Sequence, residues 1–289
     1  MRSNTAVSVL SWNVELRRFC GMPAVPHIEQ RARMLPELIR RSGADIVCLQ
    51  GVYGTSREAA LSAALKDTYL FSCWDPVRDH LGLHHGLLIL SKTAIANEEF
   101  IPFEHQLTHE HLIATRGFMQ CTVHIPGIGW VALVNLHATT GGLRRQTSRR
   151  VEAIRAEQIT EVFEKLTATY DLPSVVAGSF YASEQASRRN YVLMQLNHLD
   201  AVSVTPAERQ STWRPRPSLL ERFSIFGQAP PQRCDHVLCS KGAWKVVSAE
   251  MLFRDPLVSV PGHGMVPASD HCAVFTTLRC TADAQEVAA

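Results

Sequence analysis

Residues Asp45–Gly51, which read DIVCLQG, contain the stretch that decides the fold. The run Ile46–Leu49 is apolar without alternation, and this is typical of a strand whose two faces are both buried. Polar Gln50 follows directly, at the position where α/β sheets build their sites. This stretch therefore predicts a layered protein in which helices or a second sheet cover both faces of a central sheet.

Similar apolar runs of strand length recur along the chain. They are Val7–Trp12, Gly86–Leu90, Phe118–Val123, Trp130–Leu136, Ser174–Ala177, Asp235–Cys239 and Cys272–Leu278. Helical patterns lie between them. Apolar residues at three- and four-residue spacings predict a helix over about 28–39, with Gly43 as its stop signal, and a second over 151–166. A weaker helical pattern spans about 183–196.

Two of these strands, Phe118–Val123 and Trp130–Leu136, are separated only by a Pro-Gly-Ile-Gly turn and predict a hairpin. Adjacent strand pairs mixed with helices favour mixed sheets, so we predict an α/β sandwich. The chain of 289 residues contains no linker-like or repeated segment. We therefore expect one domain over residues 1–280, followed by a flexible tail over 281–289.

The charge balance gives no general case for a nucleic-acid partner, because 29 basic residues face 27 acidic ones, a net charge of +2. We interpret the one dense basic run as a solvated helix start; it comprises Arg144, Arg145, Arg149, Arg150 and Arg155. The eight cysteines form no C-x-x-C pair, so a zinc or thioredoxin-like site has no support. With no secretory signal and no apolar run of about 18 residues, we expect no membrane span and a cytoplasmic location.

Polar residues gather at the ends of the predicted strands. The six segments are Ser11–Asn13, Leu49–Gly51, Asn135–His137, Gly178–Tyr181, Cys234–His236 and Ser269–His271. Their order and spacing resemble the endonuclease/exonuclease/phosphatase superfamily, which reads W-N, D-I-V-C-L-Q-E, N-x-H, G-D-F-N, a late D and S-D-H. The resemblance covers about residues 7–279, and intervening pieces such as Gly86–Lys92 are most similar to the neutral sphingomyelinase branch. It implies a four-layer α/β sandwich with two packed mixed β-sheets flanked by helices.

The resemblance also implies a set of roles at the site. In the family, a magnesium ion offsets the charge on a phosphodiester, and hard oxygen ligands hold that ion. Asn13 corresponds to a metal ligand. The catalytic positions correspond to His271 as general base, Asp235 as the residue that orients it, His137 and Asp270. We expect Asn13, His137, Asp235 and His271 to meet in one cleft, with His271 bonded to Asp235 and its pKa raised.

Three family positions carry other residues. The metal-ligand Glu is Gly51, the Asp of G-D-F-N is Ser179, and its Asn is Tyr181. A further segment resembling T-W/F-D-P-x-N has Arg214 for Asp and Pro217 for Asn. We expect Gly51 to leave a void, and the Tyr181 ring to occupy part of the former metal and phosphate space.

These replaced family residues allow two interpretations. One is a pseudoenzyme with no cofactor, whose old cleft holds a phosphate-bearing ligand or a protein partner. The other is an active magnesium-dependent phosphodiesterase, sphingomyelinase-like or a nuclease, that recruits its metal through Asp270, Asn13 and a displaced Glu15 or Glu184. Asp235 and His271 could serve as a general-base pair in the second, or could simply lock two strands together.

Six histidines crowd one part of the chain: His80, His84, His85, His105, His109 and His111. Imidazole suits zinc, so a metal cluster is one interpretation. However, His84 and His85 would point apart on a strand, and none of the six matches a family motif. We therefore interpret them as solvated loop residues.

Overall fold

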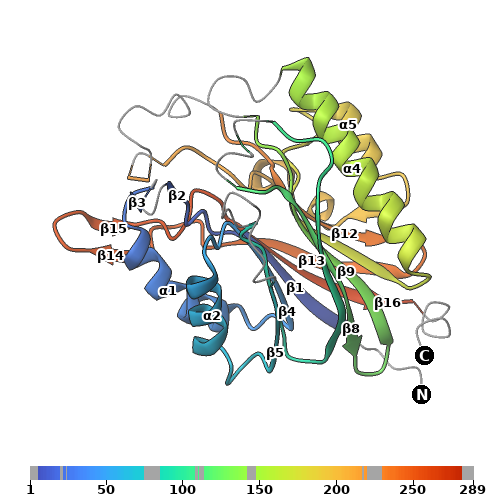
Figure 1. Ribbon diagram of the computed structural model, residues 1–289, viewed down its shortest axis with the longest axis horizontal. Coiled ribbons are helices and arrows are strands. Elements are labelled where there is room, and N and C mark those ends of the chain that lie inside the picture. The colour runs from blue at the N-terminus through green and yellow to red at the C-terminus, as the bar shows by residue number, and fades with distance from the viewer. Residues whose placement is uncertain are drawn as a thin grey trace.

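The computed structural model describes residues 6–19, 22–23, 25–74, 85–107, 110, 114–141, 148–216, 218–219 and 230–281. Two six-stranded mixed sheets pack face to face. Helices α1 (Ile28–Ser42) and α2 (Thr55–Ala64) cover one outer face, and α4 (Arg149–Thr169) and α5 (Arg188–Met194) cover the other (Figure 1). This is the α/β sandwich that the sequence predicts. Of the predicted tail 281–289, residues 282–289 lie outside the described part.

The first sheet has the order β13-β16-β1-β4-β6-β5. Its strands are β1 (Ala6–Asn13), β4 (Ile46–Gln50), β5 (Phe71–Cys73), β6 (Leu88–Ser91), β13 (Trp244–Leu252) and β16 (Ala273–Cys280). Only β1 and β4 are a parallel pair.

The second sheet has the order β11-β12-β10-β9-β8-β7. Its strands are β7 (Ile95–Pro102), β8 (Gly117–Ile125), β9 (Gly129–His137), β10 (Ser174–Ser179), β11 (His198–Asp200) and β12 (Asp235–Ser240). Here β9 and β10 are parallel, and β8 and β9 form the predicted antiparallel hairpin.

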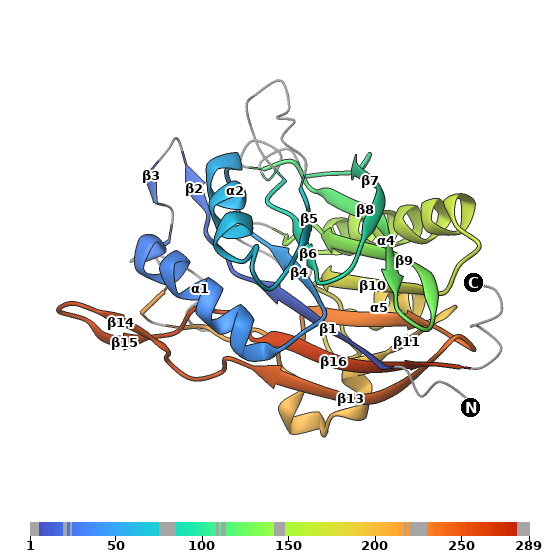
Figure 2. The ribbon, with the colours of Figure 1, turned by 90° about the horizontal axis from the view of Figure 1, so that it is seen from below.

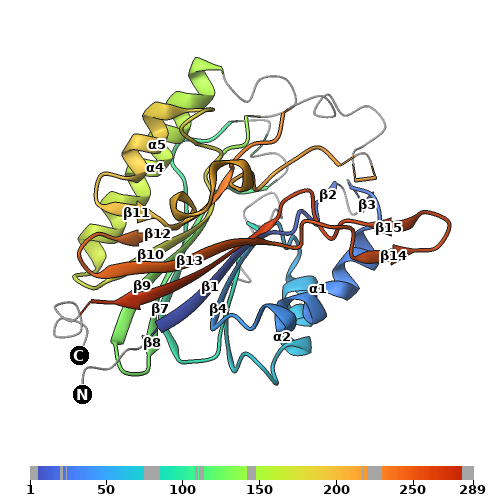
Figure 3. The same ribbon diagram turned by 180° about the vertical axis from the view of Figure 1, so that it is seen from behind.

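Shorter elements complete the described chain. They are β2 (Arg18–Phe19), β3 (Met22–Pro23), β14 (Val258–Val260), β15 (Gly264–Val266) and the 3-10 turns η1 (Ala201–Val204) and η2 (Ala207–Arg209). The β14–β15 hairpin projects from the body beside α1, as Figures 2 and 3 both show. None of the described helices is long and apolar enough to span a membrane.

The stretch Ile46–Leu49 shows why the layers form. Ile46 and Cys48 point into the apolar layer between the two sheets, whereas Val47 and Leu49 point into the layer under α1 and α2. A third apolar layer joins α4 and α5 to the outer face of the second sheet. Because β4 is buried on both faces, its register against the neighbouring strands is strongly specified. Gln50 and Gly51, at the end of β4, are therefore held in place.

Candidate functional site

The strands bring polar residues from both sheets to one edge of the sandwich. In the second sheet, His137 at the end of β9 pairs with Ser179 on β10, and Ser179 pairs with Asp235 on β12. Asn13 ends β1 in the first sheet, beside Gln50. Paired residues share a face of their sheet, and the side chains of His137 and Ser179 lie within 3.5 Å of Asn13 Nδ2.

A continuous chain of hydrogen bonds joins these residues. The Asn13 Nδ2 amide donates to Ser179 Oγ at 3.1 Å, and so links the two sheets. Ser179 Oγ donates to Asp235 Oδ1 at 2.6 Å, and Asp235 Oδ2 lies 2.7 Å from His271 Nδ1. The hydrogen bond predicted between His271 and Asp235 is therefore present. At the other end, His137 Nε2 lies 3.1 Å from the Tyr181 hydroxyl. The predicted residues Asn13, His137, Asp235 and His271 share one buried network.

The His271–Asp235 pair is buried, with His271 4% and Asp235 0% exposed. Burial on its own lowers the pKa of His271, but the charge of Asp235 and the hydrogen bond to it raise that pKa to about 9. Burial on its own raises the pKa of Asp235, but His271 and the Ser179 hydroxyl hold it below its ordinary value. His271 is consequently an imidazolium at neutral pH, and only its Nε2–H remains for another partner.

The raised His271 pKa predicts a pH-dependent contribution to stability. The contribution should be complete below about pH 6.5, the ordinary His pKa, and should be lost as pH rises through about 9, by about 3 kcal/mol. Urea unfolding of the protein and of Asp235→Asn across this range measures it, because the difference cancels the titration of other histidines. A difference that stays constant from about pH 6.5 to 9 would contradict this assignment.

Tyr181 lies inside the network and not at its surface. Its side chain is 9% exposed, and its hydroxyl is also 3.4 Å from Asn13 Nδ2. Its backbone has φ 51°, an uncommon conformation for a large residue, and hydrogen bonds from Tyr181 N to Cys234 O and from Arg155 to Tyr181 O hold it there. The Tyr181 hydroxyl thus lies against both Asn13 and His137, whose side chains are themselves 3.5 Å apart. That the Tyr181 ring occupies part of the former metal and phosphate space stays a prediction. Burial lowers the pKa of His137 well below its ordinary range, so that ring is neutral.

The void predicted at Gly51 is absent, and that prediction is wrong. Gly51 has φ +75°, and a Cβ built there would lie 2.8 Å from the backbone nitrogen of Glu15 and 2.9 Å from Asn13 Oδ1. The turn Val14–Leu16 fills the space, because Leu16 N donates to Gly51 O and Val14 N donates to Gln50 O. A residue with a side chain at position 51 would have to displace this turn.

The residues around Asn13 do not fit a magnesium ion. Asn13 Oδ1, the oxygen that would face a cation, accepts from Glu15 N at 3.1 Å, while its amide nitrogen faces Ser179 and Tyr181. The Glu15 carboxylate lies 2.8 Å from Arg17 Nε. Within the described ranges, no group of three or more His, Cys, Asp or Glu side chains is arranged to hold a metal. Magnesium prefers several hard oxygens, whereas here Asn13 Oδ1 faces the Glu15 backbone nitrogen and the Glu15 carboxylate faces Arg17.

Other residues singled out in the sequence lie beside the network. Asp270 accepts from Trp213 Nε1 at 2.8 Å, and its charge adds to that of Asp235 in raising the pKa of His271. Trp213 packs with Tyr181 and Cys234. Glu184 is exposed on the loop after Tyr181. Pro217 lies outside the described residues.

Two buried arginines that the sequence reading missed hold the loops of the site. Arg155 is 3% exposed and donates to the carbonyls of Thr139, Thr140 and Tyr181. The expectation of a solvated basic run is therefore wrong for Arg155, although Arg149 and Arg150 are exposed and Arg144 and Arg145 are not described.

Arg31 is the second of these arginines. It is 1% exposed and donates to the carbonyls of Val14, Glu15 and Ala268. Both arginines stand on the apolar stripe of their helix, Arg155 four residues after Val151 and Arg31 three residues after Ile28. A charged residue on the apolar stripe of a helix is expected to be buried, so this pattern in the sequence could have identified both arginines.

The histidine-rich segment is only partly described. His105 is exposed, as expected, but His85 is 2% exposed, accepts from Leu87 N and stacks on Phe100. The prediction of a solvated residue is wrong for His85, because its ring packs into the sandwich. His80, His84, His109 and His111 lie outside the described residues.

Comparison with known families agrees with this geometry. A sequence profile of the endonuclease/exonuclease/phosphatase family matches residues 10–271. The chain belongs to this family. No curated protein matches it significantly.

Several solved structures are similar to this protein. A sphingomyelinase C from Streptomyces griseocarneus is 18% identical with a TM-score of 0.71, over 94% of this chain and 99% of the other. A beta toxin from Staphylococcus aureus is 18% identical with a TM-score of 0.70, over 93% and 99%. A truncated TDP2 from Caenorhabditis elegans is 16% identical with a TM-score of 0.69, over 96% and 100%. At these identities the likeness establishes the shared fold.

Proposed function

We propose that this protein is a pseudoenzyme of its family, which keeps the strand-end framework but not magnesium-dependent phosphodiester hydrolysis. The position of the Tyr181 hydroxyl, bonded to both His137 and Asn13, carries this proposal. A phenol there excludes a hydrated cation, and Ser179 and Gly51 supply no carboxylate to attract one. Without the metal, the charge that develops on a phosphodiester lacks several kcal/mol of stabilisation.

The His271–Asp235 pair favours binding of a ligand over catalysis. A general base must be unprotonated at the working pH, yet Asp235 keeps His271 charged below about pH 9. A charged imidazole with a free Nε2–H instead suits an anion. We therefore propose a phosphate-bearing ligand, or a protein partner that presents one, in keeping with the phosphodiesterase family. The free buried thiols of the described cysteines fit a reducing cytoplasm.

Magnesium calorimetry on the unmodified protein tests this function. We expect no saturable heat at millimolar magnesium, and turnover of bis(p-nitrophenyl) phosphate no faster than that of His271→Ala. The alternative, an active metal-dependent phosphodiesterase that uses His271 and Asp235 as a base pair, rests on their 2.7 Å contact. Magnesium-dependent turnover that His271→Ala abolishes would establish that alternative and refute the pseudoenzyme.

Restoring the family residues gives a complementary test. Ser179→Asp with Tyr181→Asn returns a carboxylate and opens the space, and adding Gly51→Glu returns the second carboxylate. We expect only the triple variant to bind magnesium, because such groups act as a unit. The Gly51→Glu change on its own should lower the free energy of unfolding by about 1–3 kcal/mol, because position 51 has a positive φ and the new side chain displaces the Glu15 backbone. Circular dichroism and urea unfolding of each variant measure this cost and must accompany the magnesium titration. A folded triple variant that ignores magnesium would show that the loss extends beyond these positions.

A further inference from the structure

Two histidines from different elements meet where the β14–β15 hairpin passes the start of α1. His27 directly precedes α1, and His263 lies in the turn between β14 and β15. Their ring centroids are 4.7 Å apart, and the angle between the two rings is 57°. Figure 2 shows the hairpin projecting beside α1. The fold thus brings together two imidazoles that are far apart in the sequence.

Both rings offer nitrogen atoms to a ligand. Among the described residues, neither the His27 ring nor the His263 ring forms a hydrogen bond or an ion pair. His27 is half-buried and His263 is exposed, so an ion can reach the pair from solvent. Burial, the neighbouring His263 and the charge of Arg31 lower the pKa of His27, and its ring is therefore neutral near pH 7. The neutral imidazole is the form that binds a metal ion.

The distance between the two rings suits a shared metal ion. Two imidazoles that bind one zinc ion at about 2.0–2.1 Å, with a tetrahedral angle at the metal, have ring centroids about 5 Å apart. The observed separation is 4.7 Å, so small side-chain rotations would bring one nitrogen of each ring to a common ion. The turn has room for them, because a Cβ at Gly262 or Gly264 would meet nothing within 4 Å. We infer that His27 and His263 together bind a divalent transition-metal ion such as zinc, with water at its other positions.

A metal ion at this position would link the turn of the hairpin to α1. The other end of the hairpin is already tied to that helix, because Arg31 Nε donates to the carbonyl of Ala268, shortly after β15, at 2.8 Å. The ion would add a second link at His263, so the hairpin would be held against α1 at both ends. Neither His27 nor His263 belongs to the hydrogen-bonded network around His271. The inference therefore does not depend on the pseudoenzyme proposal, and either can fail without the other.

Calorimetric titration of the full chain with zinc chloride, with the thiols kept reduced, tests this site. Two protein ligands and the nearby charge of Arg31 predict a modest affinity, with a dissociation constant of about 10–100 µM. His263→Gln and His27→Asn should each weaken zinc binding about tenfold or more. Asparagine is chosen at position 27 because it tolerates the positive φ of 56° found there. The double variant should lose little more than either single variant, because each change removes the same shared site.

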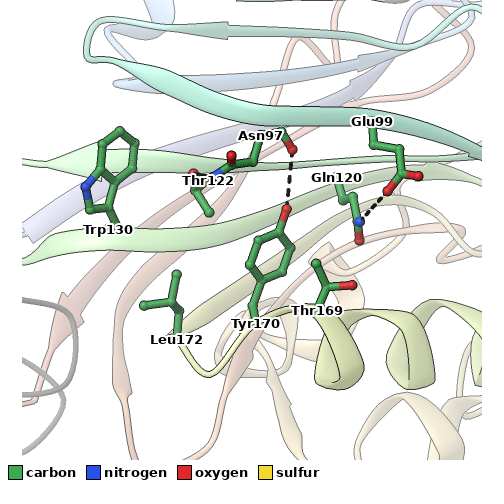
Figure 4. A pocket seen from close by; sticks show the side chains of 8 residues that line it. All are labelled: Asn97, Glu99, Gln120, Thr122, Trp130, Thr169, Tyr170 and Leu172. Carbon is green, nitrogen blue, oxygen red and sulfur yellow. Dashed lines mark hydrogen bonds between the residues drawn. The ribbon is translucent and has the colours of Figure 1, made fainter.

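His124→Gln is the matched control for these variants. His124 is also exposed and also contacts a ring, but that ring belongs to Trp130, which lines the surface pocket shown in Figure 4 and cannot bind a metal ion. This substitution should leave the zinc affinity unchanged. No saturable zinc binding up to about 1 mM would overturn the proposal. So would zinc binding that both single variants retain, or an equal loss of affinity in His124→Gln, because either result would place the ion at other residues.

Hydrogen exchange of the hairpin amides, residues 258–266, tests the link to α1 directly. With zinc at about ten times its dissociation constant, exchange at these amides should slow about tenfold, because opening the hairpin then requires release of the ion. The same zinc concentration should not change their exchange in His263→Gln. Zinc binding that leaves hairpin exchange unchanged in the unmodified protein would refute the link between His263 and His27.

Discussion

Replacing Asp235 by alanine should lower the free energy of unfolding by about 3–5 kcal/mol. The substitution leaves the His271 imidazolium buried without its carboxylate, and it removes the acceptor of the Ser179 hydroxyl. Asp235 is 0% exposed, so water cannot replace it without opening the site. Urea unfolding near neutral pH, monitored by tryptophan fluorescence, measures the loss.

Asp67→Ala is the matched control for this experiment. Asp67 also bonds to a cation, Arg40, at 3.0 Å, but its side chain is 67% exposed and water can solvate Arg40 after the change. We expect Asp67→Ala to unfold with nearly the same midpoint as the unmodified protein. If Asp235→Ala also left the free energy of unfolding nearly unchanged, the Asp235–His271 contact would not be an ion pair that stabilises the fold.

Gly178→Ala should destabilise the protein by about 4 kcal/mol or more. Gly178 has φ +144°, and a Cβ there would stand 2.1 Å from the carbonyl oxygen of Leu136 on the neighbouring strand. Because both the obstacle and the glycine belong to paired strands, β9 and β10 would have to separate. His137 and Ser179 follow directly on those strands, so the network should be disturbed as well. Urea unfolding measures the cost.

Gly43→Ala separates the steric cost from the conformational one. Gly43 ends α1 with φ +70°, but a Cβ there would meet nothing within 4 Å. This substitution should cost only about 1–2 kcal/mol, the penalty of a left-handed conformation for alanine. If Gly178→Ala and Gly43→Ala lowered the free energy of unfolding equally, the close approach of Leu136 to Gly178 would add nothing to the cost of the alanine.

The sequence by itself determined the layers, the family and the residues that meet. Continuous apolar runs such as Ile46–Leu49 require two buried faces, and polar residues that follow such strands must collect at one edge of the sheets. The order and spacing of the six polar segments, and their resemblance to the family, are why Asn13, His137, Asp235 and His271 could be named together, and why the His271–Asp235 bond could be predicted. These conclusions depend on apolar runs and on the order of short segments, which can be seen in the sequence itself.

Only the tertiary structure decided how the site is filled. Whether Gly51 leaves a void depends on the path of Val14–Leu16, and whether Arg31 and Arg155 are solvated depends on which carbonyls the loops present to them. The Tyr181 hydroxyl meets Asn13 and His137 because three chain segments converge at that point. Side-chain packing and the partners of buried polar groups arise from contacts between distant residues, so no local pattern specifies them.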